Sequence, residues 1–310
     1  MPQRANESKS SDDDACPLIC ANYCVLFVDL LGQRAALRGQ GLIPTFKSDE
    51  DREVFERTVR TSIGAISELQ RDAETFMFGH DEVRRRSALR EHLSADEQKV
   101  WDELAVHPEV KLQRWSDGLV YYSSLGSDQP ANKMTSVLKL VQLAGILYLL
   151  GLAGQRPMRG GVEIAWASEL HDGEIYGAAV ARAYELESEL AGYPRVVVGG
   201  ELQRFIRLHL AQADQGPASQ LSKSMASICG SLLSEDFDGS VFVDFLADEF
   251  ADIVGRDVHL ELAKRAHDFV SQQLAHHRQQ RDSKLALRYW HLLLYFDEWA
   301  RRIASPAEGG

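Results

Sequence analysis

A compact apolar run near the start of the chain constrains its fold more than any other segment. The run extends from Tyr23 to Leu30 and has the sequence Tyr-Cys-Val-Leu-Phe-Val-Asp-Leu. Because it is short and rich in strand-forming residues, we predict a buried strand. Its one charged residue, Asp29, stands at the C-terminal end, and Gly32 follows where a helical pattern begins. A charge beside a buried strand costs free energy unless a partner or ligand offsets it, so Asp29 is the first candidate site residue.

The rest of the chain alternates between helix-like and strand-like patterns. We predict helices over about residues 51–73, 96–105, 131–152 and 177–190, and strands over about 158–167, 194–198 and 240–244. Residues 110–123 are predicted to form a hairpin around Ser116-Asp117-Gly118, which is a turn by composition. After residue 200 the pattern is mostly helical, with a break near Ser283. This order predicts an α+β fold, an α/β sandwich.

Three parts are expected along the 310 residues. Residues 1–21 are polar with few large apolar groups and are predicted to be a disordered tail. Residues 22–205 carry the alternating pattern and form the main domain. Residues 206–310 are predicted to be a mainly helical C-terminal region packed on the core. Trp290 belongs to a wide apolar face there, so we expect it to pack on the core or on a partner chain.

Charge and composition narrow the possible partners. The net charge is −12 and no long Lys/Arg run exists, so we expect neither DNA nor RNA as a partner. No secretory signal is visible, and the most apolar segment, 137–153, falls short of a ~20-residue membrane span and is interrupted by Lys139 and Gln142. We therefore expect a cytoplasmic protein with no membrane partner. The four cysteines form no C-x-x-C pair, so a structural zinc site is not expected.

A second carboxylate stands at the tip of the predicted hairpin. Asp117 alone is an ordinary turn residue, and Asp29 alone could cap the helix that follows it. If the hairpin lies beside the first strand, however, the two carboxylates converge and repel each other unless a cation lies between them. Mg²⁺ is commonly held by one or two carboxylates together with substrate phosphates. The pair therefore predicts a metal-dependent phosphate chemistry.

Four segments together resemble the motifs of class III nucleotidyl cyclases, in the order in which that family has them. They are Phe27-Val28-Asp29-Leu30-Leu31-Gly32, Trp115-Ser116-Asp117-Gly118, Arg159-Gly160-Gly161-Val162-Glu163-Ile164-Ala165, and Ile175-Tyr176-Gly177 through Leu186. The resemblance covers about residues 23–198 and implies a class III nucleotidyl cyclase-like domain with a helical C-terminal extension. It also implies a homodimer, since such enzymes build their sites between two chains.

The resemblance implies roles for residues at the end of the first predicted strand and in the hairpin. Asp29 and Asp117 would be catalytic, bridging two Mn²⁺ or Mg²⁺ ions for an in-line displacement, and the Leu30 carbonyl would add an oxygen ligand. The helix start at Gly32, Gln33 and Arg34 could offer backbone N–H groups to the phosphates. Phe27 shares a strand face with Asp29, so it either touches the nucleotide or packs in the core.

A narrower resemblance is to the pyrimidine cyclases of the Pycsar anti-phage system. It rests on Gly160-Gly161, Tyr176-Gly177, Ala183-Tyr184-Glu185-Leu186-Glu187, Tyr193-Pro194-Arg195-Val196-Val197 and Arg288-Tyr289-Trp290. This family makes cyclic UMP or cyclic CMP, which activates a separate effector protein. The resemblance implies conversion of UTP to cyclic UMP, with CTP as the alternative substrate.

Base recognition and transition-state contacts depart from those of adenylyl cyclases. The positions that read adenine there align with Gln113 and Glu174, and a Gln amide can face either uracil or cytosine. The Asn and Arg expected on the helix after the Gly align with Ala181 and Glu185, and Arg182, one residue away, is the possible substitute. Two other interpretations stay open: an inactive cyclase-like module that binds a nucleotide, and a helical interaction protein in which both Asp residues are structural.

Overall fold

The computed structural model describes residues 20–32, 45–85, 94–104, 109–115, 118–126, 130–171 and 173–304. Its centre is β1 (Cys20–Leu30), a strand that pairs antiparallel with β3 (Gly118–Ser124) on one side and with β4 (Met158–His171) on the other. β2 (Lys111–Trp115) pairs antiparallel with β3 and completes the predicted hairpin. The predicted buried strand is confirmed, and it begins at Cys20, inside the segment expected to be a tail.

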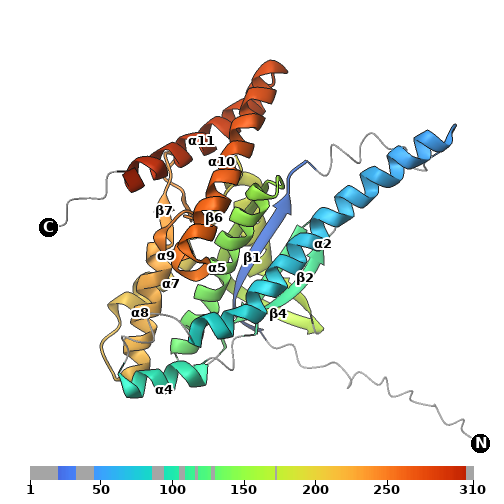
Figure 1. Cartoon of the computed structure of the whole chain (residues 1–310). Helices are drawn as coiled ribbons and strands as arrows, with labels where there is room; N and C mark the ends of the chain where they lie inside the picture. Colours follow the sequence, from blue (N-terminus) through green and yellow to red (C-terminus); the bar gives the residue numbers. More distant parts are fainter. Residues whose placement is uncertain are drawn as a thin grey trace, which may run out of the picture.

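Helices connect these strands in the order β-α-β-β-α-β. α2 (Asp49–Arg85) and α4 (Ala95–Leu104) lie between β1 and β2, and α5 (Pro130–Ala153) lies between β3 and β4. Since the strand order is β2-β3-β1-β4, this half of the chain has the ferredoxin-like arrangement. α2 begins where predicted, because the Ser48 hydroxyl accepts a hydrogen bond from the Asp51 N–H at 3.2 Å. It continues well past its expected end and crosses the molecule diagonally (Figure 1).

The sheet continues beyond β4 into the second half of the chain. β5 (Glu174–Gly177) forms a hairpin with β4, and β6 (Val196–Val198) pairs parallel with the start of β4. β8 (Val241–Val243) pairs with β6, and β7 (Leu233–Glu235) pairs with β8 at the edge. The boundary expected at residue 205 therefore falls within one continuous sheet.

Strand alternation gives the sheet two different faces. On one face, the even-numbered β1 residues from Cys24 to Leu30 join a large core with α5. On the other, Tyr23, Val25 and Phe27 join a smaller core under α6 (Ala178–Glu185). α6 continues into a π-helical turn, η1 (Leu186–Leu190), which completes the helix predicted to end at residue 190. The α+β prediction is confirmed.

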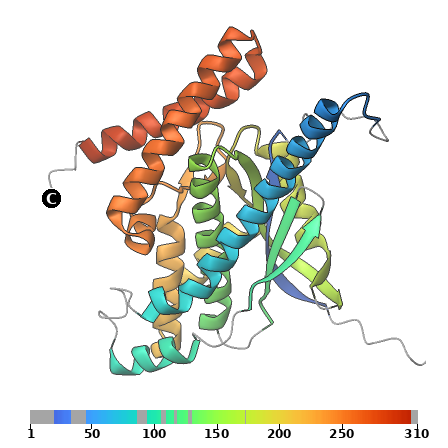
Figure 2. The ribbon, with the colours of Figure 1, turned by 45° about the vertical axis from the view of Figure 1, so that its right-hand side comes forward.

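The remaining helices cover the large core. They are α7 (Gly200–Ala211), α8 (Pro217–Ser231), α9 (Asp248–Val254), α10 (Arg256–Gln279) and α11 (Ser283–Ala304). α10 and α11 form an antiparallel pair that projects at one end of the molecule (Figures 1 and 2). α5 is long and apolar enough to cross a membrane by length and composition, but 89% of its apolar window is buried in the core. It is the buried helix that the sequence predicts.

Candidate active site at the end of strand β1

Asp29 lies where three strands meet at the C-terminal end of β1. Its register partners are Gly118 on β3 and Arg159 on β4. Side chains directly opposite in antiparallel strands share a face and have Cβ atoms about 5 Å apart. The half-buried Asp29 is therefore flanked by a guanidinium on one side and by the start of β3 on the other. Asp117 directly precedes Gly118 in the sequence, and it lies outside the described residues, as do Gln33 and Arg34.

The turn after β1 has the backbone shape that a glycine provides. Gly32 has φ +91°, and a Cβ there would meet no atom within 4 Å, so conformation and not crowding favours glycine. The Leu31 N–H donates to the Pro157 carbonyl at 2.9 Å, which fixes the turn against the start of β4. A hollow of about 710 Å³ opens beside it, lined in part by Leu30, Gly32, Arg57 and Arg60.

Three aromatic rings lie between Asp29 and the hairpin strand β2. The Phe27 ring makes edge contacts with Trp115 at 5.9 Å and with Tyr184 at 5.4 Å between centroids. Phe27 itself is only 4% exposed, whereas Trp115 and Tyr184 are 41% and 44% exposed. Phe27 thus packs in the smaller core, one of the two alternatives expected for it, while Trp115 and Tyr184 present exposed rings beside it. A Cβ on Gly118 would lie 3.0 Å from Phe27 Cζ, so glycine lets this hairpin close over the ring.

The two candidate base-reading residues come together at the junction of β2 and β5. The Gln113 side-chain oxygen Oε1 accepts a hydrogen bond from the Ile175 N–H at 2.9 Å, and Glu174 is the residue just before Ile175. Gln113 pairs with Val120 and shares its face with Trp115, so it lies roughly 12 Å from Asp29 by strand geometry. Because an N–H can only donate, this bond also fixes the orientation of the Gln113 amide.

An ion pair holds the same two hairpins together further along. Lys111 Nζ lies 2.8 Å from Glu169 Oε1, which also accepts from the Tyr122 hydroxyl at 3.0 Å and the Gly173 N–H at 3.2 Å. Burial alone would raise the pKa of Glu169, but these donors lower it overall. The carboxylate is therefore a fixed link between the β2–β3 and β4–β5 hairpins, which positions Gln113 beside β5.

Arg182 belongs to α6 and lines a separate hollow together with Asn22, Trp166 and Glu201, beside the start of β1. Asp29, at the other end of that strand, is not among the residues that line this hollow. Assistance of Arg182 at the Asp29 end of β1 stays a prediction.

Arg159 and Glu187 form an ion pair beside Asp29, and neither has a role predicted from the sequence. Arg159 Nη2 lies 2.5 Å from Glu187 Oε1, and their side chains are 17% and 3% exposed. Glu187 comes from η1, which lies close to β4 because Gly161 has no side chain: a Cβ there would be 2.2 Å from the Ala183 carbonyl. π-helical turns are common at functional sites. The ion pair keeps the Arg159 guanidinium across from the Asp29 carboxylate.

The oxygen ligands at this end of β1 suit a hard cation. Among the described residues, no group of three or more His, Cys, Asp or Glu side chains could hold a metal ion. A metal here would therefore rest on one or two carboxylates and on substrate phosphates, which is the pattern for Mg²⁺ and Mn²⁺. Asp29 is placed to supply one carboxylate, and the Leu30 carbonyl is the nearest backbone oxygen in sequence.

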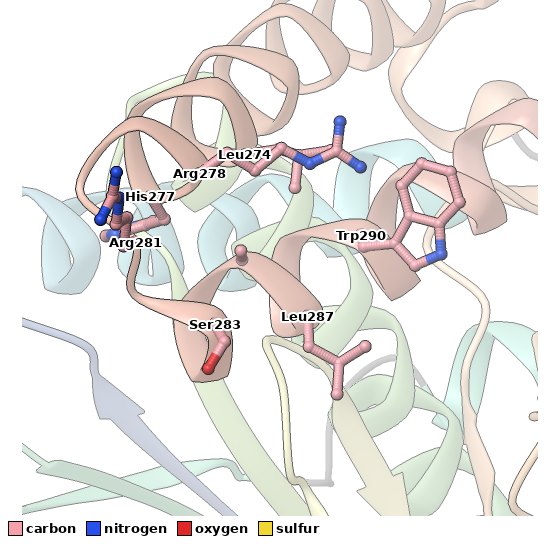
Figure 3. Close-up of a pocket in the computed structure, with 8 residues that line it drawn as sticks. Leu274, His277, Arg278, Arg281, Ser283, Leu287 and Trp290 are labelled. Atoms are coloured by element: carbon pink, nitrogen blue, oxygen red, sulfur yellow. The ribbon is translucent and has the colours of Figure 1, made fainter.

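Trp290 lies away from the core of its own chain. It is 39% exposed and lines a groove of about 530 Å³ between α10 and α11 with Leu274, Leu287 and Arg281. Arg278 extends over its ring, 5.3 Å from the centroid (Figure 3). Tyr289, Leu292 and Phe296 are the α11 residues that are buried against the core. Burial of Trp290 in the core of one chain is therefore corrected, and packing on a partner chain stays a prediction.

The fold and these residues define an α+β domain with a carboxylate, a guanidinium and exposed aromatic rings at the end of its central strand. No family model matches the chain, and no curated protein matches it. A solved structure that matches is that of the guanylyl cyclase Cya2, with 13% identity over 64% of this chain and 82% of that chain and a TM-score of 0.32. A TM-score of this size establishes no shared fold, so the functional proposal depends on the site residues.

Proposed function

We propose that the protein is a nucleotidyl cyclase that converts a pyrimidine nucleoside triphosphate, UTP, to 3′,5′-cyclic UMP and pyrophosphate. The observation that carries the proposal is the register at the end of β1, where Asp29 faces Arg159 on one side and Gly118, next to Asp117, on the other. Three of the four motif segments reach this end of the sheet, and the fourth begins at the far end of β4 and continues into α6. A carboxylate pair with an adjacent guanidinium suits a metal-bound triphosphate.

In the proposed reaction the ribose 3′ oxygen forms a bond to the α-phosphorus, and the bond from that phosphorus to the β-phosphate oxygen breaks. The 3′ hydroxyl proton passes to solvent, and pyrophosphate leaves with the electron pair. Asp29 and Asp117 would hold two Mg²⁺ or Mn²⁺ ions, which lower the pKa of the hydroxyl and neutralise the triphosphate. Arg159, kept in place by Glu187, neutralises charge on the leaving phosphates.

The state of Gln113 supports uracil over cytosine. Its Oε1 is used by the Ile175 N–H, so the amide NH₂ is the part that can face a base. An NH₂ donor matches the O4 carbonyl of uracil, whereas cytosine carries an amine at that position. Trp115 and Tyr184 would stack with the base or ribose between Gln113 and Asp29. CTP is the alternative substrate, with Glu174 accepting from the cytosine amine.

The remaining parts of the proposal follow from the resemblance to the Pycsar cyclases. The enzyme acts as a homodimer in the cytoplasm, and cyclic UMP is a second messenger that activates a separate anti-phage effector. Arg182 lines a hollow that does not include Asp29, so a second protomer is one route by which it could serve a site. Sedimentation velocity tests this part, since a monomeric enzyme with full activity would contradict it.

A second candidate is a cyclase-like module that binds a nucleotide without turning it over. The position of Arg182 and the presence of Ala181 and Glu185 in place of the usual Asn and Arg favour it. Incubation of the protein with each of the four nucleoside triphosphates and Mn²⁺ distinguishes the two candidate functions. Release of pyrophosphate and a cyclic nucleotide, fastest with UTP, supports the cyclase. A rise in melting temperature with UTP and no turnover supports the module. If the protein shows neither turnover nor a rise in melting temperature, both candidates are overturned.

A further inference from the structure

Helix α11 is fixed against the segment that follows β8 and the segment that leads into β6. The Tyr295 hydroxyl donates to Asp244 and accepts from the Leu246 N–H, and Arg302 lies 3.5 Å from Asp244. One turn earlier, the His291 ring stacks on Phe237 at 4.3 Å between centroids and lies 5.9 Å from Tyr193. The middle of α11 therefore sits over the segment that leads into β6.

This docking places Arg288 beside the start of β4. Arg288 lies one helical turn before His291 and shares its side of α11. Tyr193 is two residues before Arg195, whose carbonyl accepts from the Gly160 N–H at 3.0 Å. Gly160 follows Arg159, so Arg288 and Arg159 are neighbours although 129 residues separate them in the sequence. The pKa of Arg288 agrees with this position, because it is lowered mainly by burial and next by the nearby positive charge of Arg159.

Of two neighbouring guanidiniums, one has carboxylate partners and the other has none. Glu187 binds Arg159, and Asp29 is the register partner of Arg159 on β1, although the buried Arg159 Nε has no hydrogen-bond partner in the described part of the chain. The half-buried Arg288 side chain forms no ion pair or hydrogen bond with any described residue. The nearest acid in the sequence, Asp282, lies just before α11 and accepts from the Leu285 N–H at 3.0 Å, so it serves the start of the helix. A half-buried unpaired cation costs free energy, so an anion is the expected partner of Arg288.

We propose that Arg288 of α11 binds the terminal phosphates of the nucleoside triphosphate, together with Arg159. This inference rests on the proposed function and adds to it that the C-terminal helix pair completes the phosphate site. A guanidinium suits the task because it donates two parallel hydrogen bonds to phosphate oxygens.

The test measures binding of inorganic triphosphate to the full-length protein by isothermal titration calorimetry in the presence of Mn²⁺. R288Q is expected to weaken binding about tenfold, the usual size of one lost charge-assisted contact. R288K should recover part of the affinity, because it keeps the charge but loses the paired geometry. R281Q is the matched control: it removes the same charge from the connection between α10 and α11, where Arg281 lines the groove with Trp290 (Figure 3).

Each outcome separates this inference from the proposed cyclase activity. Wild-type affinity in R288Q, equal losses in R288Q and R281Q, or no triphosphate binding by the wild type would overturn the role of Arg288. Binding that depends on Arg288 without turnover of any nucleotide would leave the phosphate site standing and remove the cyclase. If R288Q does not fold, R288K decides: unchanged triphosphate affinity together with an unchanged KM for UTP would contradict the proposal, and a raised KM with a preserved kcat would support it.

Discussion

Asp29 shows how a single strand position can gather a site. Period-2 alternation puts its carboxylate on the face of Phe27, opposite Arg159 and the glycine that opens β3. Periodicity alone could predict this much, since it needs only the strand and its end. Periodicity could not predict Trp115, Tyr184 and Glu187 as neighbours, because their places depend on how α6 and η1 pack on the sheet. The same packing buries Phe27 beneath Tyr184, so its ring is not exposed to a ligand.

Gln113 is expected to select the base. Gln113→Ala should reduce the preference for UTP over CTP, measured as the ratio of kcat/KM values, by about tenfold or less, which is the range for one hydrogen bond. Arg114→Ala is the matched control, since Arg114 is the next residue on β2, is exposed, and lies on the opposite face of the strand. An unchanged ratio in the Gln113 variant, or an equal change in both variants, would show that Gln113 does not read the base.

Glu187 is expected to stabilise the fold by pairing with Arg159. Glu187→Gln leaves the guanidinium without its buried counter-charge, so the free energy of unfolding should fall by about 3 kcal/mol, near the lower end for a broken buried pair. Urea denaturation measures the change. Glu185→Gln, two residues earlier and exposed, should change stability by less than about 0.5 kcal/mol. Similar values for the two variants would contradict the assigned role of the pair.

At the scale of elements, long patterned segments were predictable and short ones were not. The central strand, the hairpin around residues 116–117 and α5 follow from apolar runs and turn residues. β5 and β7 have four and three residues, too few for a period to show, and they form because β4 and β8 offer free edges. The second half of α2 is mostly polar, so its sequence did not predict that the helix continues to Arg85.

The packing of α11 gives a direct comparison between two aromatic residues. Phe296 is 1% exposed in the large core, whereas Trp290 is 39% exposed beneath Arg278. Phe296→Ala should lower the free energy of unfolding by about 3–5 kcal/mol, because it leaves a cavity. Trp290→Ala should cost less than half as much, since its loss opens no enclosed space. Chemical denaturation of both variants tests the prediction, and a larger loss for Trp290→Ala would contradict the packing described above.

At the scale of the whole molecule, one ion-pair network ties the two halves of the sheet together. Arg195, just before β6, binds Asp236 and Asp238 in the turn between β7 and β8, and the Tyr193 hydroxyl also donates to Asp236. The Arg195 side chain is only 3% exposed. Its contacts therefore connect the ferredoxin-like half of the chain to the strands that follow residue 205.

This network predicts a particular loss of stability in acid. Hydrogen bonds from Arg195 hold the pKa of Asp238 at about 2, below its ordinary value of 3.8. A lowered pKa stabilises the folded state above the ordinary value, and the effect is lost as the pH falls toward 2. Asp238→Asn should thus lower the melting temperature at pH 7, and the difference from wild type should shrink between about pH 4 and pH 2. A difference that stays constant across this range would contradict the pairing.

The central claim is that Asp29 and Asp117 hold the metal ions for cyclisation. The most direct test is the rate of pyrophosphate release from UTP with Mn²⁺ by the wild type, Asp29→Asn and Asp117→Asn. Each variant removes a charged ligand shared by both ions but keeps the side-chain volume, so both should fold with an unchanged or higher melting temperature. We predict turnover by the wild type and a loss of at least about a thousandfold, more than 4 kcal/mol of transition-state stabilisation, in each variant. Wild-type rates in either folded variant would contradict the claim.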